Sequence, residues 1–167
     1  MDVGQWVLLC YHLPREPSTP RITVWRKLKR LGVAQLGDGL VALPADARTR
    51  EQLEWIAEEI VEAGGDAGIW LAHPATAGQE RALATGLAGA RAAEYAAIAA
   101  EAQRASDLGE AARRRTAKKL QAELRRISRR DYYPPPERET AHRAVRTLLE
   151  HVPTLASPRA AAGRTAR

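Results

Sequence analysis

The chain has few of the residues that mark disulfide-rich or membrane-spanning proteins. Cys10 is the only cysteine in 167 residues, so an intrachain disulfide is excluded. No run approaches the ~20 uncharged apolar residues of a membrane span, and no basic stretch precedes the first apolar segment. Phenylalanine is absent, and alanine and arginine are abundant, which we interpret as a compositional bias. These features predict a cytoplasmic protein.

Groupings typical of catalysis and of metal binding are also missing from the sequence. His73, His142 and His151 fall in separate segments without metal-ligand spacing. The glycines around Asp38 form a turn with no helix after it, unlike a phosphate loop. Cys10 falls in an apolar run, where cysteine usually behaves as a small hydrophobe and not as a reactive thiol. We therefore expect no metal, no cofactor and no enzymatic activity.

Charge is distributed unevenly along the chain. Residues 1–107 hold 11 Lys/Arg and 14 Asp/Glu, whereas residues 108–167 hold 15 and 6, a net charge of +9. Such asymmetry is typical of a segment that faces a polyanion. Alternatively, the basic segment pairs with the acidic helix that contains Glu51 and Glu62.

Hydrophobic periodicity predicts an α+β fold over residues 1–76. Apolar runs at 6–13 and 67–73 are predicted strands, and residues 33–44 are a predicted hairpin. A first helix is expected after Pro17 and Pro20, with Ser18 or Thr19 as its cap and Gly32 at its end, and a second at 47–63. This β-α-β-β-α-β order is ferredoxin-like. The predicted strands at 6–13 and 67–73 are apolar on both faces. The two helices of this fold cover only one face of the sheet, so the other face needs cover from downstream helices or from another subunit.

Two tryptophans have different expected environments. Trp25 shares an apolar stripe with Ile22, Leu28 and Leu31, so we expect it in the core. Trp55 lies off the stripe of its helix among glutamates, so we expect it to touch another helix or a second subunit. The exposed position expected for Trp55 and the second apolar face of the sheet together predict a homodimer.

The rest of the chain is predicted to form a helical extension over residues 77–152, followed by a disordered basic tail at 153–167. A helix from Ala77 to about Arg104 is alanine-rich. The next helix has a narrow apolar seam with 3-4-3 spacing, and the two are expected to form a long antiparallel hairpin. A terminal helix is expected over 137–152. The seam residues are Ala117, Leu120, Leu124 and Ile127.

Basic side chains on two of these helices are the candidate binding residues. We predict that they contact DNA phosphates or another anion, although no helix-turn-helix spacing is present from which base readout could be assigned. Tyr132 and Tyr133, beside this cluster, either stack on bases or pack inside the protein. The candidates are Arg21, Arg26, Lys27 and Arg30 on the first helix, and Arg114, Lys118, Arg125, Arg126, Arg129 and Arg130 near the basic helix.

Specific phrases in the first 45 residues resemble a known family. WVLL at Trp6, LPREPSTPR at Leu13, VWRKL at Val24 and LGVAQLGDGLVALP at Leu31 are similar to the N-terminal domain of the bacterial chromate resistance protein family ChrB. The resemblance is looser over 52–71 and at the Asp-Tyr-Tyr-Pro segment that begins at 131. It covers about residues 5–152.

The resemblance implies a DNA-binding regulator that controls a chromate efflux gene in response to chromate. Members of the family commonly continue into a second, C-terminal domain, which this sequence is not expected to contain. The strand end at Tyr11 is also distantly similar to CRISPR adaptation nuclease subunits and to phenylacetate-repressor C-terminal parts. In the nuclease-like group an aspartate ligates metal where His12 stands here, so we interpret His12 as structural or hydrogen-bonding. The alternative function is a non-DNA accessory or oxyanion-binding protein of the same resistance system.

Overall fold

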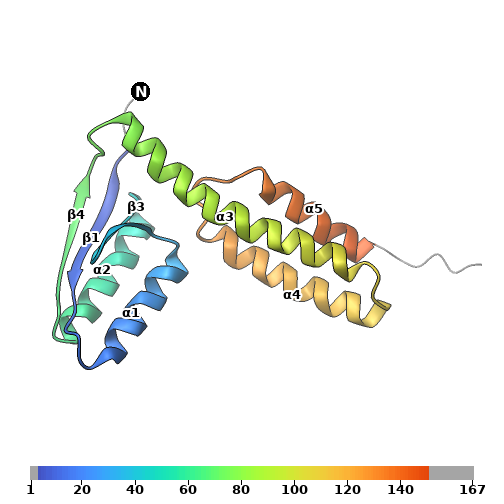
Figure 1. Cartoon of the computed structure of the whole chain (residues 1–167), viewed down its shortest axis with the longest axis horizontal. Coiled ribbons are helices and arrows are strands. Elements are labelled where there is room, and N and C mark those ends of the chain that lie inside the picture. Colours follow the sequence, from blue (N-terminus) through green and yellow to red (C-terminus); the bar gives the residue numbers. More distant parts are fainter. Residues whose placement is uncertain (1–3, 151–167) are drawn as a thin grey trace, which may run out of the picture.

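A computed structural model describes residues 4–150. An α+β part lies at one end of an elongated molecule and a helical bundle at the other, with one long helix running through both (Figure 1). The elements are β1 (Trp6–His12), α1 (Ser18–Leu31), β2 (Ala34–Gly37), β3 (Leu40–Pro44), α2 (Ala47–Glu62), β4 (Asp66–Ala72), α3 (Ala77–Ala105), α4 (Glu110–Ser128) and α5 (Glu137–Glu150).

The sheet has the strand order β2-β3-β1-β4, with all neighbours antiparallel. This confirms the predicted α+β fold with its β-α-β-β-α-β order. β1 lies between β3 and β4, and Leu8 is opposite Ala42 on one side and Trp70 on the other. A strand that is apolar on both faces is thus placed at the centre of the sheet.

One face of the sheet is covered by α1 and α2, which lie on the same side (Figure 1). Side chains alternate along a strand, so Val7 and Leu9 of β1 point toward these helices and are fully buried. Val24, Leu53 and Ile60 meet them from the helices. α2 begins with a reciprocal cap, in which Thr49 N donates to Asp46 Oδ1 (2.6 Å) and Asp46 N donates to Thr49 Oγ1 (3.0 Å).

The second face of the sheet is covered only in part. The first half of α3 crosses it and buries Leu87 against Trp6 and Ala42. Further along the same face, Cys10 is exposed and 65% of Trp70 is exposed. The expectation that Cys10 behaves as a buried small hydrophobe is therefore wrong, because α3 covers the opposite end of the face from this residue.

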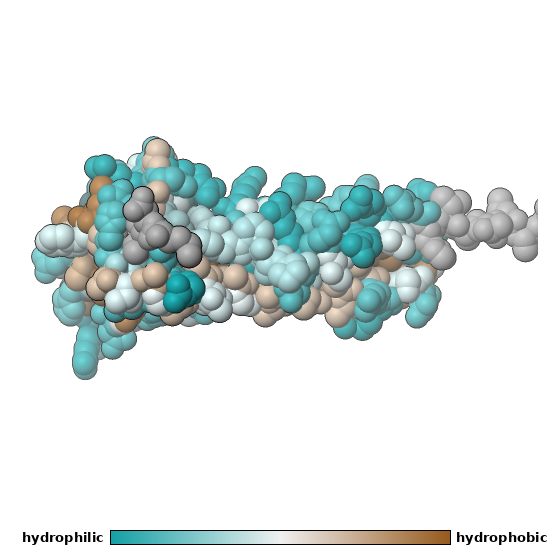
Figure 2. All heavy atoms as spheres, turned by 90° about the horizontal axis from the view of Figure 1, so that it is seen from above, coloured by the Kyte–Doolittle hydropathy of each residue, from teal (hydrophilic) through white to brown (hydrophobic). Residues whose placement is uncertain are grey.

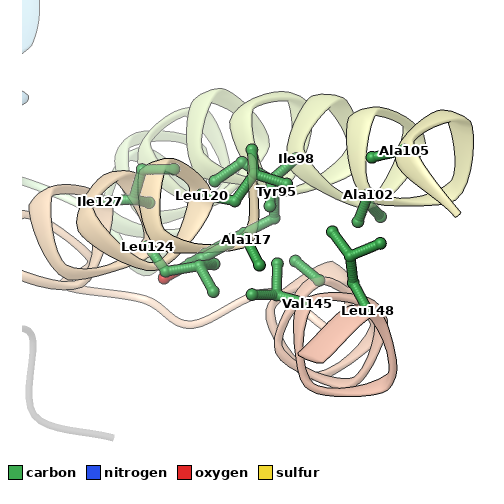
Figure 3. Close-up of a cluster of buried hydrophobic side chains, with 12 residues drawn as sticks. Tyr95, Ile98, Ala102, Ala105, Ala117, Leu120, Leu124, Ile127, Val145 and Leu148 are labelled. Carbon is green, nitrogen blue, oxygen red and sulfur yellow. The ribbon is translucent and has the colours of Figure 1, made fainter. Parts of the chain in front are cut away.

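The second half of α3 forms a three-helix bundle with α4 and α5. Figure 3 shows side chains from all three helices pointing toward one another. The predicted seam of α4 is buried, with Leu120 fully inaccessible, and Tyr95 of α3 and Val145 of α5 pack against it. α3 is 29 residues long, which corresponds to about 43 Å. One continuous helix therefore belongs to both hydrophobic cores.

The orientation of α1 differs from the expectation. The exposed fraction of Trp25 is 51% and that of Ile22 is 46%, so Trp25 is not a core residue. α1 packs through Val24 and Leu28, which turns the Trp25 side of the helix outward. Trp55, at 63% exposed, lies on the surface of α2.

Some expectations concern residues that the structure does not describe. The predicted disordered tail at 153–167, the last two residues of the predicted helix at 137–152 and His151 lie outside the described residues. Over residues 4–150, none of the helices combines the length and apolar character that would be needed to cross a membrane.

Candidate functional site

Four of the predicted basic residues line one cleft at the junction of the two parts. The cleft has a volume of about 390 Å³ and lies where the ends of α1 and α4 approach the start of α2. We call it the arginine cleft. Its lining residues are Arg30, Leu31, Arg48, Gln52, Arg126, Arg129, Arg130 and Tyr132.

Helix ends position these guanidinium groups. Arg30 lies in the last turn of α1 and Arg126 in the last turn of α4, where the negative end of the helix dipole stabilises a positive charge. Arg48 lies in the first turn of α2, just after the Asp46 cap. Arg48 Nη1 donates to the backbone oxygen of Arg129 (3.0 Å), which connects the start of α2 to the end of α4.

Tyr132 forms the aromatic wall of the cleft. Its hydroxyl donates to the backbone oxygen of Leu31 (3.0 Å), and the Arg48 guanidinium lies 5.9 Å from its ring centroid. Burial raises the pKa of Tyr132, while nearby Arg48 opposes that shift. Tyr133 stacks on Trp6 with ring centroids 6.3 Å apart, and burial raises its pKa too. Both rings thus pack within the protein, one of the two environments considered from the sequence.

The electrostatic character of the arginine cleft is strongly positive. No acidic residue belongs to its lining, which lies entirely within the described part of the chain. Arg130 is partly withdrawn from the cleft, because its Nη2 pairs with Glu94 of α3 at 2.8 Å. Arg30, Arg126 and Arg129 are exposed. These three side chains, with Arg48, are available to an anion that enters from solvent.

The other predicted basic residues do not gather in the cleft. Lys27 forms an ion pair with Glu59 of α2, and Arg114 pairs with Glu110 of its own helix (2.7 Å). The remaining four are exposed, with Arg21 and Arg26 on α1 and Lys118 and Arg125 on α4.

The ion pairs of the basic segment differ from the alternative considered from the sequence, in which it pairs with the acidic helix that contains Glu51 and Glu62. Lys119 pairs with Glu101 (3.0 Å) and Arg130 with Glu94, both acids of α3. Glu59 of α2 pairs with α1 instead. The acids that meet these two cations therefore come from the alanine-rich helix, whereas the sequence pointed to residues 51–62.

Arg48 and Gln52 are cleft residues that sequence reasoning missed. Arg48 is a cation at the start of a helix whose later charges are mainly acidic, and that local exception was the available signal. The Gln52 Oε1 atom is buried without a hydrogen-bond partner among residues 4–150. A buried acceptor of this kind is unusual and is consistent with a polar ligand or water in the cleft.

The described residues include no group of three or more His, Cys, Asp or Glu side chains that could hold a metal ion. His12 lies exposed at the end of β1, opposite Asp66 of β4. The chemistry that the arginine cleft can offer is binding: a guanidinium presents a planar fork of donors that matches phosphate and other oxyanions.

Comparison with known proteins gives a consistent family relation. The model of the family described as "Protein ChrB, N-terminal" matches residues 21–124. Protein ChrB of Cupriavidus metallidurans is 36% identical over 66 residues, which cover 40% of this chain and 20% of the relative. The aligned part thus spans about a fifth of that relative's length. No solved structure matches the chain.

Proposed function

Because the chain belongs to the ChrB N-terminal family, we propose that it is a cytoplasmic, DNA-binding regulator associated with chromate resistance. The observation that carries the DNA-binding part is the arginine cleft, in which five arginines from three helix ends converge with no acid in the lining. Arginine forks at this density favour a phosphate-bearing partner.

The outer face of α4 supports a contact longer than the cleft. Exposed Arg114, Lys118 and Arg125 lead along the helix to Arg129 at its end. From Arg114 to Arg129 the helix rises about 22 Å, roughly the length of six base pairs of duplex. A DNA backbone laid along α4 could thus enter the arginine cleft at its end.

The experiment is a salt-series binding assay on DNA from upstream of the gene, with and without chromate. We expect the logarithm of the binding constant to fall linearly with the logarithm of salt concentration, by about 0.9 per phosphate neutralised. In the double variant Arg126→Ala/Arg129→Ala the slope should fall by about 1 to 2.

The matched control is Arg104→Ala/Arg143→Ala, which removes the same charge from exposed positions on the helical bundle. It should leave the slope nearly unchanged. Equal losses in the two double variants would contradict the assignment to the arginine cleft. If the protein shows no preference for a DNA sequence at any salt concentration, the regulator function is rejected. If it shows a preference that chromate does not change, the protein binds DNA but does not sense chromate.

The convergence of guanidinium groups in a space of about 390 Å³ also favours a second candidate, an oxyanion-binding accessory protein. A cleft of this size admits a single tetrahedral anion such as chromate. Calorimetric titration with chromate distinguishes the two functions. Two results together would favour the accessory function. The natural protein should bind chromate saturably and the Arg126→Ala/Arg129→Ala variant should not, and the natural protein should bind no DNA.

We also propose that the chain forms a homodimer through the uncovered part of the sheet, which we call the open sheet face. Leu8, Cys10, Leu36 and Trp70 form it, and 42% of Leu36 and 65% of Trp70 are exposed. Figure 2 shows that hydrophobic colour is strongest at the sheet end of the molecule, while most of the visible surface is hydrophilic. Burying such residues against a second copy would remove apolar surface from water.

A further inference from the structure

A second cleft, which shares Arg30 and Arg130 with the arginine cleft, lies between α1 and α3. Its volume is about 700 Å³, within the range of about 300–1,000 Å³ that is typical of ligand sites. β2 and Val41 of β3 form part of its wall. We call it the α1–α3 cleft.

One wall of this cleft is a flat stretch of α3. Ala82, Gly86 and Ala90 follow each other at four-residue spacing, so they lie on one side of the helix. A Cβ atom added at Gly86 would meet nothing within 4 Å, which shows that the space beside it is open. Leu83 and Leu87 flank the stretch and add apolar surface. This wall would accept a flat, apolar group.

The opposite wall carries an aromatic ring and a positive charge. Trp25 is 51% exposed on α1, and the Lys29 Nζ atom lies 4.7 Å from its ring centroid. The Trp25 ring lines the cleft and offers a flat apolar face to a ligand. Tyr11 also lines the cleft.

A buried cation lies in the wall of the same cleft. Arg91 is only 7% exposed, and its Nε atom is buried without a hydrogen-bond partner among the described residues. One of its terminal nitrogens is 3.0 Å from Glu94, which also pairs with Arg130. One carboxylate thus serves two guanidinium groups. Burial lowers the pKa of Arg91, while Glu94 and Asp131 oppose that shift.

From these walls we propose that the α1–α3 cleft binds a small organic anion with a flat ring and a single carboxylate or phosphate group. The ring would lie between Trp25 and the flat wall at Gly86, and the anionic group would reach Arg91 and Lys29. Arg30 and Arg130 line both clefts, whereas Trp25, Gly86 and Arg91 line only the α1–α3 cleft, so variants at these three positions test it without changing the arginine cleft.

The test uses calorimetric titration of the full chain with 2-naphthoate. Its matched probes are the neutral 2-naphthylmethanol, which keeps the ring, and inorganic phosphate, which keeps only a charge. We expect naphthoate to bind with a sub-millimolar dissociation constant and each matched probe to bind at least tenfold more weakly. Equal affinity for naphthoate and the neutral analogue, or no binding of naphthoate at millimolar concentration, would overturn the proposal.

Variants then locate the site. Gly86→Leu fills the cleft, whereas Gly89→Leu makes the same change at an exposed position of α3 that also has no atom within 4 Å. The first should weaken naphthoate binding at least tenfold and the second should not. Trp25→Ala should weaken binding, while Trp55→Ala removes a more exposed ring elsewhere and should not. Equal effects within either pair would place the naphthoate outside the α1–α3 cleft and contradict the proposal.

Discussion

Arginine has two roles in this protein, which depend on how much of each side chain reaches water. Arg126 and Arg129 are exposed at the end of α4, where their charges stay solvated in the free protein and can reach a ligand. Arg91 and Arg113 are each 7% exposed and lie within the protein. For Arg91, Glu94 offsets part of the cost of burying the charge. Counting arginines in the sequence gives the total charge but does not separate these two roles.

At the scale of the residue, the buried phenol of Tyr132 predicts a loss of stability in alkali. Burial raises its pKa above the ordinary value of 10.0, so the folded state favours the protonated form. The free energy of unfolding should therefore fall as pH rises above about 10. Urea denaturation between pH 8 and 11 measures this slope.

Replacement of the phenol isolates its share of the pH effect. Tyr132→Phe should be less stable at pH 8 by about 1 kcal/mol, because the hydrogen bond to Leu31 is lost. Its stability should nevertheless decline less steeply above pH 10 than that of the natural chain. The slope will not vanish, since burial also raises the pKa values of Tyr11 and Tyr133. Identical slopes would show that Tyr132 does not contribute.

At the scale of the element, periodicity predicts that a helix exists more reliably than it predicts which side faces inward. The stripe containing Ile22, Trp25 and Leu28 is a valid amphipathic pattern, yet α1 is turned so that Val24 and Leu28 are buried. Val24 and Leu28 pack in the core beneath the sheet, and Lys27 forms an ion pair with Glu59 of α2. The spacing of apolar residues is a local pattern that predicts a helix. The direction in which that helix turns its side chains depends on the sheet and the helix packed against it.

The end of α1 gives a prediction at the same scale. Gly32 has a left-handed φ of 69°, and a Cβ atom there would collide with Arg91 Nη1. Gly64 at the end of α2 has a similar φ of 79° with no atom within 4 Å of an added Cβ. Gly64→Ala should therefore lower the free energy of unfolding by about 1–2 kcal/mol through backbone strain alone.

Gly32→Ala should cost more than its matched control, because Arg91 must also move. Urea denaturation of both variants measures the difference. Nearly equal losses would show that Arg91 yields freely, and the contact between α3 and the end of α1 would then be loose.

At the scale of the whole molecule, the sequence predicted both parts but not how they join. The order of predicted strands and helices places a domain border after residue 76, which stays a prediction; α3 begins at Ala77. However, Leu87 of α3 packs against the sheet while Ile98 packs in the bundle, so the helix crosses that border. The arginine cleft arises at this junction from residues about 100 positions apart. The sequence shows Arg48 as a cation in a mainly acidic helix, but its place beside the end of α4 depends on the tertiary fold, which local patterns do not give.

Assembly provides the prediction at this scale. Trp70→Arg places a charge on the open sheet face, and Trp55→Arg does the same on α2, the surface that the sequence favoured for a subunit contact. Both tryptophans are more than 60% exposed, so neither change should unfold the monomer. Light scattering should give twice the chain mass for the natural protein and for Trp55→Arg, and the single chain mass for Trp70→Arg. A monomeric natural protein, or dissociation only by Trp55→Arg, would contradict the proposed contact.

Because α3 is one continuous helix, the number of residues between its two packed halves sets the rotation of the helical bundle relative to the sheet. Each residue of an α-helix advances about 100° around the axis. One residue inserted between Leu87 and Tyr95 would leave both hydrophobic cores chemically intact. It would nevertheless swing α4 by more than a quarter turn around α3, and carry Arg126 and Arg129 away from Arg48. In this protein, insertions and deletions within the seven residues 88–94 should be far more damaging to the arginine cleft than substitutions there.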